Sequence, residues 1–298
     1  MSSSQSAEIG LGHTILRRAS LTPNARALTF EGQTWTCAEL GDRVRRLATI
    51  LRDGGVSRGD RIGYIGLNHP AFLELLYACG CVGAVFVPLN FRLTGPEVRF
   101  IGNDSDITVM FADDMLRPLI ESEKSNLNCS RYLTIESDAE GWEPLAPLME
   151  SASALAESEH VDADEVAFIM YTSGTTGFPK GVMVTQQQLA NFVVSTLLIP
   201  PRVDAGKPSL IVAPLFHAAA LCNGIVTLCM GRPVVILKEF EPLQLVKTLV
   251  SEKIAEIMLP PALILATLKS VKNLNEYDFS HLEKIFYGAS SITVDVLR

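Results

Sequence analysis

Residues 166–185, VAFIMYTSGTTGFPKGVMVT, set a polar loop between two apolar, strand-like runs. The loop itself, TSGTTGFPKG (172–181), holds four hydroxyl residues, three glycines, one lysine and no acidic residue. Glycines let backbone N–H groups turn inward, hydroxyls add neutral donors, and the lysine adds one positive charge. This composition predicts a loop that binds a polyphosphate.

The loop differs from that of the common nucleotide triphosphatases. The pattern G-x-x-x-x-G-K-[ST] would need glycine at Pro179 and a hydroxyl residue at Gly181. The kinase and GTPase templates are therefore excluded. An ordinary Ser/Thr/Gly loop between strands would explain a few of these residues but not all ten.

Outward from this loop, apolar runs of four to eight residues alternate with amphipathic stretches, which is typical of parallel strands joined by helices. The pattern predicts an α/β fold of mostly parallel sheets flanked by helices in two sub-lobes. Strands are expected at 61–67, 84–89, 107–112, 132–136, 166–171, 181–185, 210–216, 233–240, 254–259 and 283–288. Helices are expected near 70–82, 95–103, 113–124, 186–198 and 218–230, after Glu241 and Pro261, and from Ser290. Capping boxes at Thr36/Glu39, Thr94/Glu97 and Thr185/Gln188 mark helix starts.

Length and charge narrow the functional classes. The 298 residues suffice for about two folding units, and the acidic stretch 137–165 predicts a boundary between sub-lobes 10–160 and 161–298. A net charge of −8 argues against nucleic acid or an anionic membrane as partner. The 24 residues 208–231 carry no charge, but their prolines predict a strand, a turn and a helix rather than an integral membrane segment.

The cysteines favour a reducing compartment. None of the six forms a CxxC pair, so we expect reduced thiols in a cytoplasmic protein. The pair Cys79 and Cys81 has no second ligand pair nearby, which favours core burial over a metal site, and no metal ligand is assigned.

Candidate site residues follow from the ends of the predicted strands, where open parallel sheets bind their ligands. The residues concerned are Thr172, His217, Pro260 and the group Gly288, Ala289 and Ser290. His217 stands among uncharged residues, so it is either a hydrogen-bonded core histidine or a group that faces substrate.

The segment YTSGTTGFPKGVMVT (171–185) resembles the signature of the adenylate-forming, or AMP-binding, enzymes. The segments 89–106, 213–221 and 285–298 are similar to acyl-CoA synthetases, and the resemblance extends from about residue 14 to residue 298. It implies that residues 1–298 are a truncated N-terminal adenylation domain without the C-terminal lid. It also implies ATP, Mg²⁺ and coenzyme A as cofactors or co-substrates.

The resemblance assigns roles to particular residues. The phosphates of ATP would contact Thr172, Ser173, Gly174, Thr175, Thr176, Gly177 and Lys180. The adenine and the acyl chain would lie along Gly288, Ala289 and Ser290. His217 would lie near the activated carboxylate and, with Lys180, would be catalytic; Phe216, Ala218, Asn223 and Pro260 would contact the acid.

An apolar carboxylic acid is the expected substrate. A relative that activates an amino acid needs a carboxylate to pair with the ammonium group, and 208–231 offers none. We therefore expect an acyl-CoA synthetase for a fatty acid, inactive as this chain alone. The alternatives are a non-catalytic nucleotide- or acyl-binding module, an aryl-CoA ligase, or an acyl-AMP ligase that serves a carrier protein. A homo-oligomer or a complementing C-terminal fragment would be the macromolecular partner.

Overall fold

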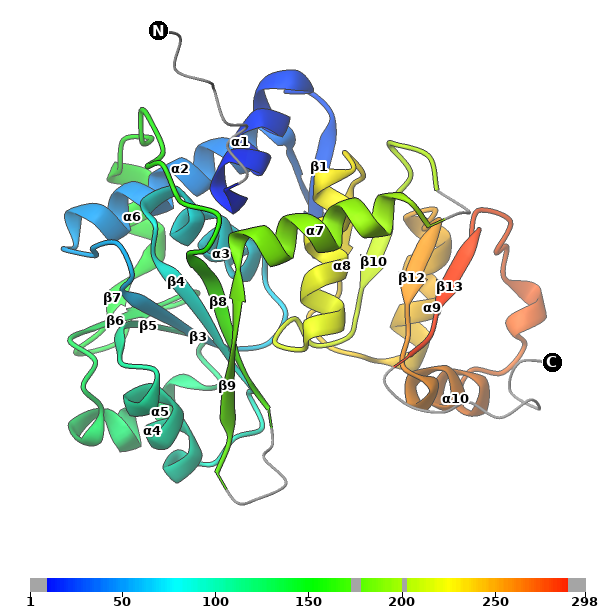
Figure 1. Ribbon diagram of the computed structural model, residues 1–298. Coiled ribbons are helices and arrows are strands. Elements are labelled where there is room, and N and C mark those ends of the chain that lie inside the picture. Colours follow the sequence, from blue (N-terminus) through cyan, green and yellow to red (C-terminus); the bar gives the residue numbers. More distant parts are fainter. Residues whose placement is uncertain (1–9, 173–177, 200–202, 289–298) are drawn as a thin grey trace, which may run out of the picture.

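A computed structural model describes residues 10–172, 178–199 and 203–288, and it consists of two sheets with helices between and outside them (Figure 1). The predicted α/β class is confirmed. The first sheet has the order β7 (Glu143–Pro144), β6 (Arg131–Thr134), β5 (Ile107–Ala112), β3 (Arg61–Ile65), β4 (Val85–Leu89), β8 (Val166–Thr172) and β9 (Lys180–Thr185). The second has the order β13 (Lys284–Phe286), β12 (Glu256–Met258), β10 (Ser209–Ile211), β11 (Val234–Ile236), β1 (Arg26–Phe30) and β2 (Gln33–Thr36).

Helices cover both faces of each sheet. The main core joins the two sheets through α1 (Leu11–Leu21), α2 (Cys37–Asp53), α3 (Pro70–Val82), α6 (Leu145–Ser151), α7 (Gln186–Leu197) and α8 (Ala218–Cys229). A second core packs α4 (Gly95–Asp104) and α5 (Arg117–Glu123) on the outer face of the first sheet. A third packs α9 (Pro242–Ser251) and α10 (Pro261–Ser270) on the outer face of the second sheet.

Helix α3 shows why the sequence produces these layers. Its segment PAFLELLYACGCV is apolar nearly all round, and every one of its residues is buried. Such a helix has no solvent face and must lie between layers. Cys79 and Cys81 belong to it and are buried, free thiols. A Cβ atom on Gly80 would lie 2.6 Å from the backbone nitrogen of Gly12, so α1 and α3 contact each other through glycine.

Three predicted helix starts are confirmed by capping boxes at α2, α4 and α7. The strand pair β1–β2 was not predicted. Its two-residue turn, Glu31 and Gly32, has positive φ at both positions (47° and 81°), the geometry of a type I′ hairpin turn. Glutamate is an unusual residue for that conformation, so the local sequence carries no clear turn signal.

Strands from both sides of residue 160 take part in each sheet. β8 and β9 extend the sheet that contains β3 to β6, whereas β1 and β2 complete the sheet formed by β10 to β13. The predicted sub-lobes 10–160 and 161–298 thus do not coincide with the two sheets. β9 runs antiparallel to β8 rather than parallel, because a short loop joins them directly.

The uncharged stretch 208–231 forms β10, a loop and α8, as expected. Across the described residues, no helix combines the length and the apolar character that crossing a membrane requires. Of the predicted runs, 210–216 contains two strand residues, and 233–240 and 254–259 contain three each. The residues after these strands, 212–216, 237–240 and 259, continue past the carboxyl ends of the strands.

Candidate active site

A cavity of about 480 Å³ lies where the two sheets meet, and we call it the junction cavity. Its walls come from the carboxyl ends of β4 and β8, from the loop and helix that follow β4, and from the N-terminus of α8. Of the predicted site residues, it contains Thr172, Phe216, His217 and Ala218. The fold therefore brings together two segments that are 44 residues apart in sequence, since Thr172 belongs to one sheet and Phe216 follows a strand of the other.

The hairpin strands β8 and β9, which flank the predicted phosphate loop in sequence, border this cavity through Thr172 and Pro179. Thr172 and Lys180 are the last paired residues of the hairpin. The five residues between them, Ser173, Gly174, Thr175, Thr176 and Gly177, lie outside the described residues. Phe178 stacks on Phe100 of α4 with 5.0 Å between ring centroids, and Pro179 lines the cavity. Both arms of the loop are therefore anchored at the cavity.

Lys180 begins β9 with an exposed side chain and makes no ion pair with a described residue. It does not line the junction cavity. Its ammonium group is thus available to an anion that approaches the hairpin loop from solvent.

Tyr171 and Asp104 form a contact that sequence reasoning missed. The Tyr171 hydroxyl donates a hydrogen bond of 2.6 Å to Asp104 Oδ2. Burial and this bond raise the pKa of Tyr171 far above its ordinary value, so the phenol stays protonated. A Cβ atom on Gly181 would lie 3.1 Å from the Tyr171 ring, so the glycine after Lys180 leaves space for this tyrosine. The pair joins β8 to the end of α4.

His217 precedes the first residue of α8, and its side chain is exposed at the cavity. It is thus not a core histidine. Its ring contacts the Phe216 ring, with 4.2 Å between centroids. Partial burial lowers the pKa of His217, and the nearby charge of Arg92 lowers it further. The imidazole is therefore neutral at physiological pH and can donate or accept a hydrogen bond.

The N-terminus of α8 adds to the positive character of the cavity. The first backbone N–H groups of a helix have no partner within it, and no side chain of a described residue caps them in α8. Arg92 lines the same cavity. A helix N-terminus and an arginine both favour an anion, such as a carboxylate or a phosphate.

Asn68 holds the segment that carries His217, and sequence reasoning missed it. The side chain is 3% exposed. Its Nδ2 donates to the carbonyl oxygens of Ala213 and Leu237 at 3.2 and 3.1 Å, and its Oδ1 accepts from the Leu215 N–H at 2.8 Å. Asn68 follows β3 in the first sheet, whereas its partners follow β10 and β11 in the second. It therefore links the two sheets directly behind the site.

Asn223 does not line the junction cavity that contains His217. It lines a second cavity of about 250 Å³, which we call the α8 cavity, between α8, the end of α7 and the strands β12 and β13. Ala218 lines the junction cavity and Ala219 lines the α8 cavity, so the two cavities are adjacent along α8.

The remaining predicted residues follow strands of the second sheet. Pro260 precedes α10 and lines neither cavity. Gly288 comes after β13, and a Cβ atom on this glycine would have no described heavy atom within 4 Å beyond its chain neighbours. Ala289 and Ser290, together with the helix expected from Ser290, lie outside the described residues.

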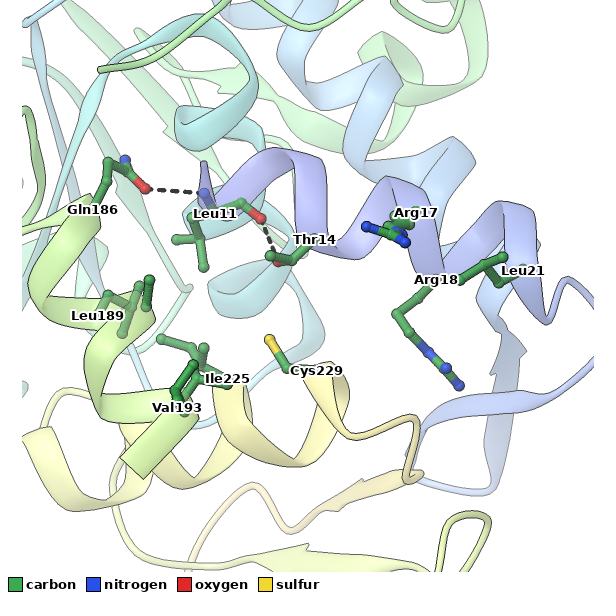
Figure 2. A pocket seen from close by; sticks show the side chains of 12 residues that line it. Leu11, Thr14, Arg17, Arg18, Leu21, Gln186, Leu189, Val193, Ile225 and Cys229 are labelled. Carbon is green, nitrogen blue, oxygen red and sulfur yellow. Dashed lines mark hydrogen bonds between the residues drawn. The ribbon is translucent and has the colours of Figure 1, made fainter. Parts of the chain in front are cut away.

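A third cavity, of about 340 Å³, lies among α1, α7 and α8 (Figure 2). At one end, Oε1 of the buried Gln186 accepts a hydrogen bond of 2.9 Å from the Leu11 N–H (Figure 2). Gln186 is the first residue of α7, directly after β9. This bond therefore fixes the second arm of the hairpin against α1.

Comparisons with known proteins identify similar chains. The chain is 36% identical over 293 residues to a feruloyl-CoA synthase from Amycolatopsis sp, a match covering 96% of this chain and 56% of that protein. It is 31% identical over 293 residues to the long-chain-fatty-acid–CoA ligase FadD13 from Mycobacterium tuberculosis, covering 97% of this chain and 57% of that protein. The chain thus spans about half the length of the curated relatives it matches.

The fold comparison gives the same result. The N-terminal domain of FACL13 from Mycobacterium tuberculosis aligns with a TM-score of 0.88 and 26% identity, covering 96% of this chain and 71% of that chain. The family of AMP-binding enzymes matches residues 15–298. This chain therefore belongs to the AMP-binding enzyme family.

Proposed function

We propose that the protein to which this chain belongs is an acyl-CoA ligase that activates an apolar carboxylic acid with ATP. One observation carries the proposal. The hairpin of the phosphate loop and the His217 end of α8 border a single cavity, although they come from different sheets. The two relatives named above are a feruloyl-CoA synthase and a long-chain-fatty-acid–CoA ligase, which supports the proposal.

In the first half-reaction, a carboxylate oxygen would bond to the α-phosphorus of ATP while the bond from that phosphorus to the bridging oxygen breaks. Pyrophosphate leaves and acyl-AMP forms. The hairpin loop and Lys180 would hold the departing phosphates, and His217 with the α8 N-terminus would hold the carboxylate. These residues contribute by positioning and by stabilising negative charge.

In the second half-reaction, the sulfur of coenzyme A would bond to the acyl carbon, and the bond from that carbon to AMP breaks. Within the described residues, no group of three His, Cys, Asp or Glu side chains could hold a metal ion. Mg²⁺ is commonly bound through substrate phosphates with one or two carboxylates, so the nucleotide would supply most of its ligands.

The α8 cavity would take the acyl chain. It is lined by Ala219, the neighbour of Ala218 in the junction cavity, and its walls include Phe192, Val226, Met258 and Phe286. Glu256 also lines it, but this carboxylate is paired with Arg232 at 2.9 Å. No free carboxylate among the described lining residues is left to pair with an ammonium group, which favours an acid without one.

Pyrophosphate exchange with the whole protein tests the proposal. A panel of saturated fatty acids, ferulate and amino acids would be compared for acid-dependent exchange of labelled pyrophosphate into ATP. We expect exchange with the apolar acids and a loss of at least tenfold in Lys180→Ala and in His217→Ala. Tight binding of ATP without exchange for any acid would instead support the non-catalytic binding module.

A further inference from the structure

The α8 cavity has apolar walls but a charged end. Along β12, Glu256 and Met258 are two residues apart and so share one face of the sheet, and Lys284 and Phe286 lie beside them on β13. Glu256 and Lys284 lie at the amino ends of β12 and β13. The junction cavity lies toward the carboxyl ends of the strands, so the charged end of the α8 cavity is the end distant from it.

A buried ion pair forms this end. The side chains of Arg232 and Glu256 are 2% and 7% exposed, and Nη1 lies 2.9 Å from Oε1. Arg232 Nε donates to the Lys207 carbonyl oxygen at 3.1 Å. The Nη2 nitrogen is buried and has no hydrogen-bond acceptor among the described residues. A buried N–H group without an acceptor is uncommon, because it has lost its water without gaining a partner.

The span of α8 between the two cavities gives the length scale of a molecule that lies in both. Ala218 lines the junction cavity and Val226 lines the α8 cavity, and they are eight residues apart, or about 12 Å at 1.5 Å each. An extended chain advances about 1.2 Å per bond, so this span corresponds to about ten bonds.

We propose that Arg232 and Glu256 are specificity-determining residues that select an acid of this length with a terminal hydroxyl group; this inference rests on the proposed function. The hydroxyl oxygen accepts from Arg232 Nη2, and its proton is donated to the Glu256 carboxylate. A plain alkyl end leaves Nη2 without an acceptor. A second carboxylate would be repelled by the Glu256 carboxylate, which already neutralises Arg232, and Lys284 at the same end would offset this repulsion only in part.

The test compares three acids of equal chain length in the whole protein: dodecanoate, the same acid with a terminal hydroxyl, and dodecanedioate. Acid-dependent pyrophosphate exchange gives kcat/KM for each. We expect the hydroxy acid to exceed dodecanoate at least tenfold and dodecanedioate by more. If dodecanoate equals or exceeds the hydroxy acid, this inference is wrong while the proposed function stands. If none of these acids and no other acid supports exchange, the proposed function fails and takes this inference with it.

A double variant identifies the residues responsible. Arg232→Met with Glu256→Leu removes both charges together, which avoids leaving one buried charge unpaired. We expect the preference to reverse in favour of dodecanoate. The matched control is Arg43→Met with Glu74→Leu, an ion pair between α2 and α3 that does not line the α8 cavity; its preference should stay as in the wild type. An unchanged preference in the first double variant would refute the assignment, and the three-acid comparison decides the matter in the wild type if that variant does not fold.

Discussion

Replacing Asn68 by alanine removes the link between the two sheets behind the candidate site. The change deletes an Oδ1 acceptor and an Nδ2 donor from a side chain that is 3% exposed. It leaves the Leu215 N–H without its partner and takes one hydrogen bond each from the Ala213 and Leu237 carbonyl oxygens. Water cannot replace these bonds without opening the core.

The expected loss of stability follows from the polar groups that Asn68→Ala leaves without a partner. A buried polar group that loses its partner costs about 1–3 kcal/mol. The Leu215 N–H has a single proton to donate and bears that cost in full, whereas each carbonyl oxygen has a second lone pair and bears less. We expect a loss of about 3 kcal/mol in the free energy of unfolding, a large share of the roughly 5–15 kcal/mol of a typical domain.

Asn103→Ala is the matched control. The Asn103 side chain also donates to one backbone carbonyl, that of Asn126, and accepts from one backbone N–H, that of Asn128. It lies at the surface, where water can take over both bonds, so we expect a loss of less than about 1 kcal/mol.

Urea unfolding of both variants and amide hydrogen exchange at Leu215 measure these effects. Exchange at Leu215 should accelerate in Asn68→Ala and stay unchanged in Asn103→Ala. Equal unfolding midpoints in the two variants, together with unchanged exchange at Leu215, would refute the role given to Asn68.

Three further changes test other parts of the structure. Burial lowers the pKa of His69 from 6.5 to about 4, so the unfolded chain takes up the proton first. As pH falls from 6.5 to 4 the protein should lose up to about 3 kcal/mol of stability, and urea titrations should show a smaller loss in His69→Asn. Gly80→Ala should cost about 1–3 kcal/mol because α1 and α3 must separate, and an unchanged melting temperature would contradict this close contact. Gln186→Leu should cost about 1–2 kcal/mol through the orphaned Leu11 N–H, with faster amide exchange at Leu11 as its specific sign.

Much of the secondary structure could be predicted because its signals are local. The α3 helix is observed at 70–82, where its apolar run and the following glycine place it, and the capping box at Thr185 correctly marks the start of α7. These signals need only residues within one turn of each other. The division of strands between two sheets could not be predicted in the same way, because it depends on contacts between residues far apart in the chain.

The sequence indicates a candidate site residue most clearly where that residue belongs to a motif within one segment. The loop residues and His217 belong to short, distinctive motifs. Asn68, Asp104 and Arg232 are ordinary polar residues in their local sequence. The roles of the first two depend on partners 67 to 169 positions away, and the role of the third depends on its burial. A buried polar residue is informative once its burial is known, and burial is a property of the fold rather than of the segment.

The candidate site lies at the junction of the two sheets because each sheet contributes a different element to it. The antiparallel pair β8–β9 holds the two ends of the predicted phosphate loop at the border of the first sheet. A helix N-terminus that faces the same point needs a strand-to-helix connection, which β10–α8 supplies in the second. Neither sheet provides both at one position. Asn68 links the two sheets behind the cavity and so keeps His217 aligned with the β8–β9 hairpin. A substitution that removes this link should therefore displace His217 relative to the hairpin before it disturbs either sheet.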